Sequence, residues 1–481
     1  MRLAPWLTVL AVALAPRVIA QALPELGGPG DAAISPQVER RIGESLMREI
    51  RARDPSYYDD AEISDYLAQL GSRLVQAGAA RQDFEFFAMR DATVNAFAMP
   101  GGFVGVHTGL IAISDTESEL ASVLAHEVAH VTQRHLARML GQEQRMQLPM
   151  LAALAAAVLF ARSRPDLAAA GALGAQGAAV QSALSYSRDF EREADRVGLQ
   201  TLQAAGFDTR AMAAFFEKLQ RATRVSDDGT LPGYLRTHPV TVERIADAQN
   251  KAAAMPYRQH LDSPEFQFVR AKLRAEAGDA HDAAASFEAA VRERRYVSEA
   301  AARYGLASAL LRAGKLPEAQ AQIARVRALG VASPMLDLLA ARARRATGDA
   351  QGANELLAAA RARYPYSRAV IYAQVAGLQE AGRGEAALDA LADAIRLYPR
   401  DARLYEMRAQ SSSALGKRLA AHQAQGEAYA LQGSLPAAIE QLQLARQAGD
   451  GDFYQLSVVD ARLRELRAQL AAENKEAKAG R

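Results

Sequence analysis

Cysteine is absent from the 481-residue sequence, and histidine is scarce, with 8 in the whole chain. The absence of cysteine excludes disulfides, iron–sulfur clusters, thiolate-ligated zinc and cysteine nucleophiles. Any metal must therefore be held by histidine, aspartate and glutamate. The compartment is not fixed by this absence, because an oxidising compartment permits disulfides without requiring them.

An excess of charge of either sign is also lacking. The chain has 57 basic and 55 acidic side chains, which gives a formal net charge of +2. This balance gives no reason to expect nucleic acid or an anionic membrane surface as a partner. Half of the residues are hydrophobic and 23% are charged, which is the composition of a globular protein. The length suggests about two to four domains.

The amino-terminal apolar run is too short to cross a bilayer, which takes about 20 residues. Residues 3–14 are apolar except for Pro5 and Thr8, and small or aliphatic residues lead up to Ala20. A positive start, a short apolar core and such an ending are typical of a secretory signal. We predict that residues 1–20 are a signal peptide cleaved near Ala20, so that the mature chain is exported.

A second apolar stretch, rich in alanine and leucine, covers residues 149–178. Arg162, Arg164 and Asp166 interrupt it well below the length that spans a bilayer. We therefore expect a buried helix or a mobile lid there. Any membrane association of the protein should be at most peripheral.

The segment between these stretches predicts helices and a small sheet. Residues 36–78 have apolar side chains three and four positions apart, which is typical of amphipathic helices. Short apolar runs separated by turn residues predict three strands, at residues 84–89, 94–99 and 103–107. Ser114 and Glu117 have the spacing of a capping box, which predicts a long helix from there to about Leu140.

Evenly spaced glycines mark the carboxyl-terminal half of the chain. They lie 36, 34, 34 and 34 residues apart, at Gly278, Gly314, Gly348, Gly382 and Gly416. Each ends one apolar-periodic helix before the next begins, and a 34-residue helix–turn–helix period is the signature of tetratricopeptide (TPR) repeats. We predict a TPR-like domain at residues 256–472 and a charged tail at 473–481. The alternative is a helical bundle without repeats.

The strongest chemical signal is His126-Glu127-Val-Ala-His130, an H-E-x-x-H motif on a predicted helix. Residues one turn apart lie on the same helix face, so His126 and His130 can reach one zinc ion at about 2.1 Å. Glu127 can approach the attacking water and act as general base, then return the proton to the leaving amine. The alternative is a charged helix with two incidental histidines.

A catalytic zinc needs a third protein ligand, and the acidic segment after residue 187 offers one. Glu191 and Asp195 share a helix face, and the small residues Ala194 and Gly198 beside them permit close approach to another helix. We assign Glu191 to the metal and Asp195 to the ring N–H of a ligand histidine. Glu193 is expected to point elsewhere. The alternative is a solvated run of charges.

Two other histidines lie outside this set of ligands. His135 follows the motif off the ligand face, and we expect it to be an incidental surface residue. His238 lies in a loop ahead of a helix that contains Arg244, so both side chains can point into one cleft. Either can stabilise the oxyanion of a tetrahedral intermediate. His238 can instead fill the open zinc position and keep the enzyme inactive.

These residues together resemble the M48 family of metallopeptidases. The resemblance is carried by the H-E-x-x-H motif, Glu191-x-x-Ala194-Asp195, His238-Pro239 with Arg244, and Asn95–Gly102. It implies endopeptidase activity and one Zn2+ per chain. It also implies that His126, His130 and Glu191 ligate the zinc and that Glu127 is the catalytic base.

The resemblance has further implications for regulation and substrate binding. It gives His238 the role of a ligand that must leave before catalysis. In other members of the family, the positions that match His238 and Arg244 bind substrate or the oxyanion. The strand predicted at residues 103–107 is the expected edge on which an extended substrate lies by β-augmentation.

The predicted fold class is mainly α. We expect an α+β peptidase domain with a small sheet at residues 21–255, followed by the α-helical TPR solenoid. Exported members of the family with such repeats imply a periplasmic peptidase in quality control and assembly of outer-membrane proteins, with TPR repeats that dock substrates or assembly machinery. Two alternatives remain: a chaperone-like TPR adaptor with a largely latent peptidase, and a dedicated processing peptidase for one exported precursor.

Overall fold

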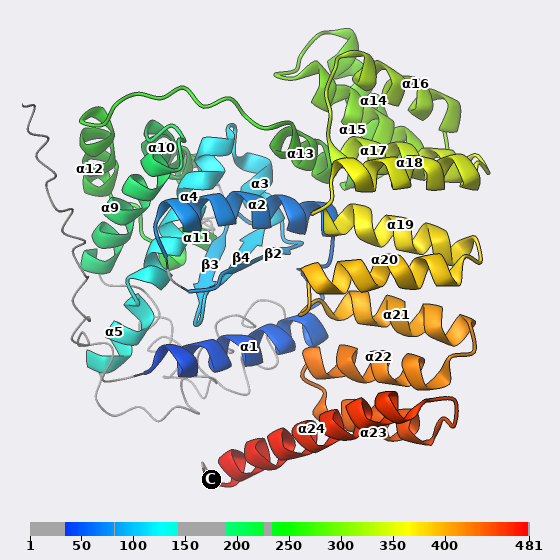
Figure 1. The fold of residues 1–481 in the computed structure, drawn as a ribbon. Coiled ribbons are helices and arrows are strands. Elements are labelled where there is room, and N and C mark those ends of the chain that lie inside the picture. Colours follow the sequence, from blue (N-terminus) through cyan, green and yellow to red (C-terminus); the bar gives the residue numbers. More distant parts are fainter. Residues whose placement is uncertain (1–33, 81, 143–187, 226–232, 480–481) are drawn as a thin grey trace, which may run out of the picture.

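The computed structural model describes residues 34–80, 82–142, 188–225 and 233–479. The predicted signal peptide and the alanine- and leucine-rich stretch at 149–178 lie outside these residues. Within them the fold is mainly helical with one four-stranded sheet, which confirms the predicted fold class (Figure 1). Among the described helices, none combines the length and the apolar character that crossing a bilayer requires.

The sheet has the strand order β1-β2-β4-β3. Its strands are β1 (Tyr57–Tyr58), β2 (Glu85–Met89), β3 (Ala96–Met99) and β4 (Phe103–His107). The central pair β2–β4 is parallel, and the outer pairs are antiparallel. The three predicted strands are confirmed to within two residues, whereas β1 is too short to leave a periodic signal.

The prediction that residues 103–107 form a sheet edge is wrong. β4 lies between β2 and β3, so the edge strands are β1 and β3. Gly101 and Gly102 have φ values of 77° and 90°, a left-handed turn that folds β4 back along β3. β2 then pairs with the other side of β4. The order of strands depends on this tertiary pairing, which the period of the sequence does not encode.

Helices surround the sheet in the amino-terminal half. They are α1 (Pro36–Arg53), α2 (Ala61–Ala77), α3 (Thr108–Ile113), α4 (Glu117–Thr132), α5 (His135–Gln142), α9 (Arg188–Ala204), α10 (Arg210–Val225), α11 (Gly233–Thr237) and α12 (Val242–Ala253). The central helix is α4, which packs against α2, α9, α10 and β3. Every residue from Glu117 to His130 is buried. The polar groups between Glu117 and His130 are therefore surrounded by protein.

The predicted capping box and helix length need correction. Thr116 caps α4, because its side chain accepts from the Glu119 N–H at 3.2 Å. Ser114 instead ends α3 and donates to the Leu110 carbonyl. The helix stops at Thr132 and does not continue to Leu140. Arg134 has φ of 54°, and this left-handed residue turns the chain before α5 begins.

The carboxyl-terminal half is a column of helices stacked in sequence order, from green to red in Figure 1. They are α13 (Pro264–Glu276), α14 (Ala280–Arg292), α15 (Glu299–Arg312), α16 (Leu316–Ala328), α17 (Pro334–Ala346), α18 (Ala350–Arg363), α19 (Arg368–Glu380), α20 (Gly384–Leu397), α21 (Ala402–Ala414), α22 (Arg418–Leu431), α23 (Leu435–Gln447) and α24 (Phe453–Ala479). The five periodic glycines all have positive φ and lie in turns between consecutive helices. Assignment to the TPR class and the domain boundaries remain predictions.

Helix α2 joins the two halves through buried charge. Glu62 binds Arg342 of α17 at 2.7 Å and also binds Lys272 of α13. Asp65 accepts from the Arg368 side chain at 3.1 Å, beside the start of α19. Because α2 also packs against α4, the helical column lies one helix away from the H-E-x-x-H motif.

Candidate metal centre

Four buried side chains converge inside the amino-terminal half. His126 and His130 lie one turn apart on α4, Glu191 lies in the first turn of α9, and His238 follows α11. One ligand atom from each lies within 4.8 Å of all the others. Gly198 allows α9 to lie close to α4, because a Cβ at this position would lie 3.2 Å from the backbone nitrogen of His126. The structure thus brings together the three predicted ligands and His238.

The spacing of these atoms fits one zinc ion. Ligands at about 2.1 Å from a tetrahedral metal lie about 3.4 Å from one another. The Nε2 atoms of His126 and His130 are 2.9 Å apart, and they lie 3.5 and 3.4 Å from the Glu191 carboxylate oxygens. Two imidazole nitrogens and a carboxylate are also donors that zinc prefers. The donor set and its dimensions therefore suit the metal.

His238 supplies a fourth donor to the cluster. Its Nδ1 lies 2.9 Å from Glu191 Oε1 and 3.4 Å from His126 Nε2. Its Nε2 lies 3.5 Å from Glu127 Oε1. The ring is buried, so His238 is not an incidental surface residue. It lies where a fourth metal ligand would lie.

Glu127 is fully buried beside these donors. Neither of its carboxylate oxygens makes a hydrogen bond of normal geometry to the described residues. Burial raises the pKa of this carboxyl, although the nearby rings of His238 and His126 act in the opposite direction. Buried carboxylates usually have partners, so this arrangement suits a group that acts on a bound water or substrate.

Asp195 and Arg244 support the ligands from behind. Asp195 Oδ1 lies 2.9 Å from His126 Nδ1, the ring atom that does not face the cluster. Arg244 donates to both oxygens of Asp195 at 2.8 Å and lies 2.8 Å from Glu191 Oε2. It also donates to the Pro239 carbonyl. In this structure, the donors of Arg244 therefore go to the carboxylates and the backbone rather than to an oxyanion position.

The expectation that His135 is a surface residue is wrong. The left-handed turn at Arg134 places His135 beneath His130, where it is fully buried. The Nδ1 atoms of the two rings are 2.9 Å apart, and His135 Nε2 lies 3.2 Å from Glu193. Burial lowers the pKa of His135 to about 4, so its ring is neutral. Glu193 points away from the metal cluster, as expected, but contacts this ring.

Protons can be placed along these contacts in one consistent way. Glu193 accepts from His135 Nε2, and His135 Nδ1 then accepts from His130 Nδ1. This leaves His130 Nε2 without a proton, so that its lone pair can bind a metal. On the other ligand, Asp195 Oδ1 lies 2.9 Å from His126 Nδ1, which favours a proton on Nδ1 and leaves the lone pair of His126 Nε2 for a metal. Both imidazoles are therefore oriented for metal binding by carboxylates that do not touch the metal.

Tyr234 on α11 was not singled out from the sequence. Its ring is fully buried and stacks on His238, with centroids 4.8 Å apart and planes 30° apart. The backbone N–H of Tyr234 donates to the backbone carbonyl of Val94 at 3.0 Å, just ahead of β3. A lone tyrosine in a short helix carries no motif that would have identified it.

Among the described residues, no strand pairs with the outer side of β3, and this free edge of the sheet runs beside the metal cluster. β3 packs against α4, and its other side pairs with β4. The carbonyl of Asn95 faces β4, where it accepts from the His107 N–H. Because backbone groups alternate along a strand, those of Val94, Ala96 and Ala98 face the free edge. The backbone of Ala98 lies close enough to Glu127 to lower the pKa of its carboxyl.

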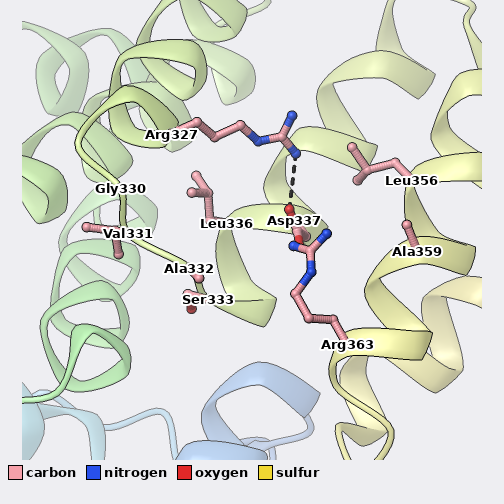
Figure 2. A pocket seen from close by; sticks show the side chains of 10 residues that line it. All are labelled: Arg327, Gly330, Val331, Ala332, Ser333, Leu336, Asp337, Leu356, Ala359 and Arg363. Carbon is pink, nitrogen blue, oxygen red and sulfur yellow. Dashed lines mark hydrogen bonds and ion pairs between the residues drawn. The ribbon is translucent and has the colours of Figure 1, made fainter.

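A separate pocket of about 420 Å3 lies in the helical column, between α16, α17 and α18 (Figure 2). Asp337 lies in its centre between Arg327 at 3.1 Å and Arg363 at 2.8 Å. The lining contains no histidine and no glutamate, and its aspartate is already paired with two arginines. This pocket therefore lacks the groups that the peptidase reaction needs.

Comparison with known proteins agrees with this chemistry. Residues 61–252 match the model of peptidase family M48. The chain is 35% identical over 300 residues to the beta-barrel assembly-enhancing protease of Yersinia pestis, covering 62% of this chain and 61% of the relative. It is 37% identical over 254 residues to the protein of the same name from Escherichia coli, covering 53% and 52%.

A more distant relative is the mitochondrial metalloendopeptidase OMA1 of Schizosaccharomyces pombe. The two are 29% identical over 218 residues, which covers 44% of this chain and 60% of the relative. The chain thus matches about half to three fifths of the length of these curated relatives. Residues 61–252 are a domain of peptidase family M48, a family of zinc-dependent metallopeptidases.

Proposed function

We propose that the protein is a zinc-dependent endopeptidase whose metal is held by His126, His130 and Glu191. The observation that carries this proposal is the convergence of these three donors, at spacings that suit one ion, beside the buried carboxylate of Glu127. When bound, the zinc ion would polarise the peptide carbonyl and activate a water molecule. The reaction class is hydrolysis of a peptide bond.

The residues around the metal site have different roles in the reaction. Glu127 takes a proton from the attacking water and delivers it to the leaving amine. Asp195 orients His126, while His135 and Glu193 orient His130. Arg244 balances the charge of Glu191 and Asp195 in a site that excludes solvent. In this assignment Arg244 acts through the ligands, whereas its place in the sequence predicted a contact with the oxyanion of a tetrahedral intermediate.

The experiment that tests the proposal replaces Glu127 by Gln. The amide keeps the shape of the side chain but cannot take a proton from water. We expect cleavage of casein to disappear while zinc content stays near that of the wild type. Cleavage that survives the substitution would remove Glu127 as the base.

We further propose that the peptidase is gated by His238. The support is the position of its Nδ1, within 3.4 Å of His126 Nε2 and 2.9 Å of Glu191. A fourth protein ligand closes the coordination position that a catalytic zinc keeps for water or substrate. His238 must therefore leave the cluster before hydrolysis begins.

The substrate is proposed to be an extended polypeptide that adds to the edge of β3. Main-chain hydrogen bonds to Ala96 and Ala98 would align it beside α4 and Glu127. β3 takes the place of β4, the strand expected from the sequence to form the edge. The support is the sheet order, in which no strand of the described residues pairs with the outer side of β3, close to the site.

The biological role follows from the relatives. Because two of them are named beta-barrel assembly-enhancing proteases, we propose that this protein acts in the periplasm on outer-membrane and envelope proteins. The predicted signal peptide at residues 1–20 would direct export. The helical column, if it is a TPR domain, offers a surface for docking substrates or assembly machinery. Its buried links to α2 would keep such a partner close to the site.

A second candidate function is a chaperone-like adaptor whose peptidase is largely latent. The observation that favours it is the same closed cluster, because a site with four protein donors has no open position. The two candidates differ in whether removal of His238 releases proteolysis. A peptidase dedicated to one exported precursor remains an alternative, and it predicts cleavage of that precursor but not of casein.

A further inference from the structure

Tyr234 connects two parts of the site that are far apart in sequence. On one side its N–H donates to the carbonyl of Val94, which faces the free edge of the sheet just ahead of β3. The α11 segment therefore already occupies the start of the edge on which a substrate strand would lie. Beyond this point, Ala96 and Ala98 are the residues of β3 whose backbone groups face outward.

Tyr234 also contacts His238, through its backbone carbonyl and its ring. The carbonyl of Tyr234 accepts from the His238 N–H at 2.8 Å, and the tyrosine ring lies flat against the imidazole. Tyr234 thus contacts both the backbone and the ring of His238, in addition to the contacts that the ring makes with Glu191 and His126. The tyrosine hydroxyl is buried and has no hydrogen-bond partner among the described residues, so the ring is the part that matters for this packing.

A strand and α11 cannot both occupy the outer side of Val94. Neighbouring strands in a sheet lie about 4.8 Å apart, and this space next to Val94 is filled by the backbone of Tyr234. A polypeptide that extends its pairing along the edge past Ala96 must displace Tyr234. Because Tyr234 makes both a backbone and a ring contact with His238, the displacement also removes support from the fourth donor.

We propose that Tyr234 is a positioning residue that makes binding of a polypeptide strand at β3 and ligation by His238 mutually exclusive. Substrate then opens the site by occupying the edge, and no separate activating partner is required for this step. The inference rests on the proposed gated peptidase and adds what releases the gate.

The first test compares the wild type with three variants of the mature full-length protein. Each protein carries Co2+ in place of zinc, and its visible absorption spectrum is recorded. Cobalt bands report the number and geometry of ligands. We expect the spectrum of Tyr234→Ala to match that of His238→Ala, because both lose the fourth donor. Tyr234→Phe keeps the ring and should give the wild-type spectrum. A wild-type spectrum in Tyr234→Ala would overturn the proposal.

A second test avoids any risk that Tyr234→Ala disturbs folding. It uses the Glu127→Gln variant, in which Tyr234 and His238 are intact, at a concentration of unfolded β-casein that saturates binding. We expect peptides covering residues 233–238 to lose protection from hydrogen exchange, and the cobalt spectrum to shift towards that of His238→Ala. Bound casein with unchanged exchange and spectrum would refute the coupling.

Failure of the coupling is distinguishable from failure of the proposed function. If His238→Ala cleaves casein while bound casein leaves residues 233–238 protected, the gated peptidase stands and Tyr234 is not its trigger. If neither the wild type nor His238→Ala cleaves casein, the peptidase assignment itself fails.

Discussion

His135 lies directly behind the metal-facing residue His130, with their Nδ1 atoms 2.9 Å apart, and its other ring nitrogen faces Glu193. This contact fixes which nitrogen of His130 carries the proton. The metal-binding face of α4 is thus set partly by a residue on the next helix. The relationship leads to a first prediction about a side chain that does not touch the metal.

Replacing His135 by Phe should weaken zinc binding by about 10- to 100-fold, the usual effect of removing a partner behind a ligand histidine. The ring still fills the buried space, but it cannot accept from His130. Competition with a chelator of known affinity measures the change. His281→Phe, at an exposed position on α14, is the matched control and should leave zinc affinity unchanged. Equal affinities for both variants would show that His135 only fills space.

Glu191→Ala should reduce zinc occupancy more than Glu193→Ala. The first removes a carboxylate whose oxygens lie within 3.5 Å of both ligand nitrogens of α4. The second removes the partner of His135 and Arg138, two side chains outside the metal cluster. Zinc per chain, measured after dialysis, ranks the two variants. The reverse order would mean that the wrong acid has been assigned to the metal.

Arg244→Gln should destabilise the zinc-free protein by about 3–5 kcal/mol, as expected when one partner of a buried ion pair is removed. Glu191 and Asp195 then share a buried site without their arginine. Bound zinc should reduce this loss, because the ion supplies positive charge beside Glu191. Urea unfolding with and without zinc measures both values.

The control for that experiment is Arg292→Gln, at an exposed position on α14. It should change the free energy of unfolding by less than about 0.5 kcal/mol. If Arg244→Gln behaved like this control in the zinc-free protein, Arg244 would not be the charge partner that the geometry indicates.

Glu62 should make the free energy of unfolding depend on pH in the acidic range. Burial alone raises the pKa of its carboxyl, but Arg342 and Lys272 outweigh burial, so the pKa in the folded state lies below the usual 4.5. A lowered pKa contributes stability that is fully present above the unfolded value and is lost as the pH falls through the folded value. The contribution is therefore present at pH 7 and decreases below about pH 4.5.

The measurement is the difference in unfolding free energy between wild type and Glu62→Gln at several pH values. We expect about 2–3 kcal/mol at pH 7 and a smaller difference in acid, because Gln cannot pair with Arg342 as a charge. Glu288→Gln, at an exposed position on α14, is the control. A difference that does not vary with pH would show that the ion pair contributes nothing specific.

Much of the metal cluster could be predicted because helix periodicity determines it locally. The spacing of His126 and His130 places them on one face, and small residues beside Glu191 indicate where another helix comes close. The structure brings these residues together. The turn-forming glycines likewise follow from the 34-residue period.

Other features depend on contacts between distant parts of the chain. His135 became buried because Arg134 adopts a left-handed conformation that its residue type does not favour. The edge strand was misassigned because strand order is a tertiary property. The pairing of Glu62 with Arg342 joins residues 280 positions apart, and neither lies in a motif.

The most direct test of the central claim is zinc content of the purified mature chain, combined with casein cleavage by the wild type and by His238→Ala. We expect about one zinc per chain in both proteins, slow cleavage by the wild type and faster cleavage by the variant. Absence of zinc and of cleavage in both would contradict the peptidase and favour the adaptor. One zinc with slower cleavage in the variant would show that His238 assists the reaction and does not block it.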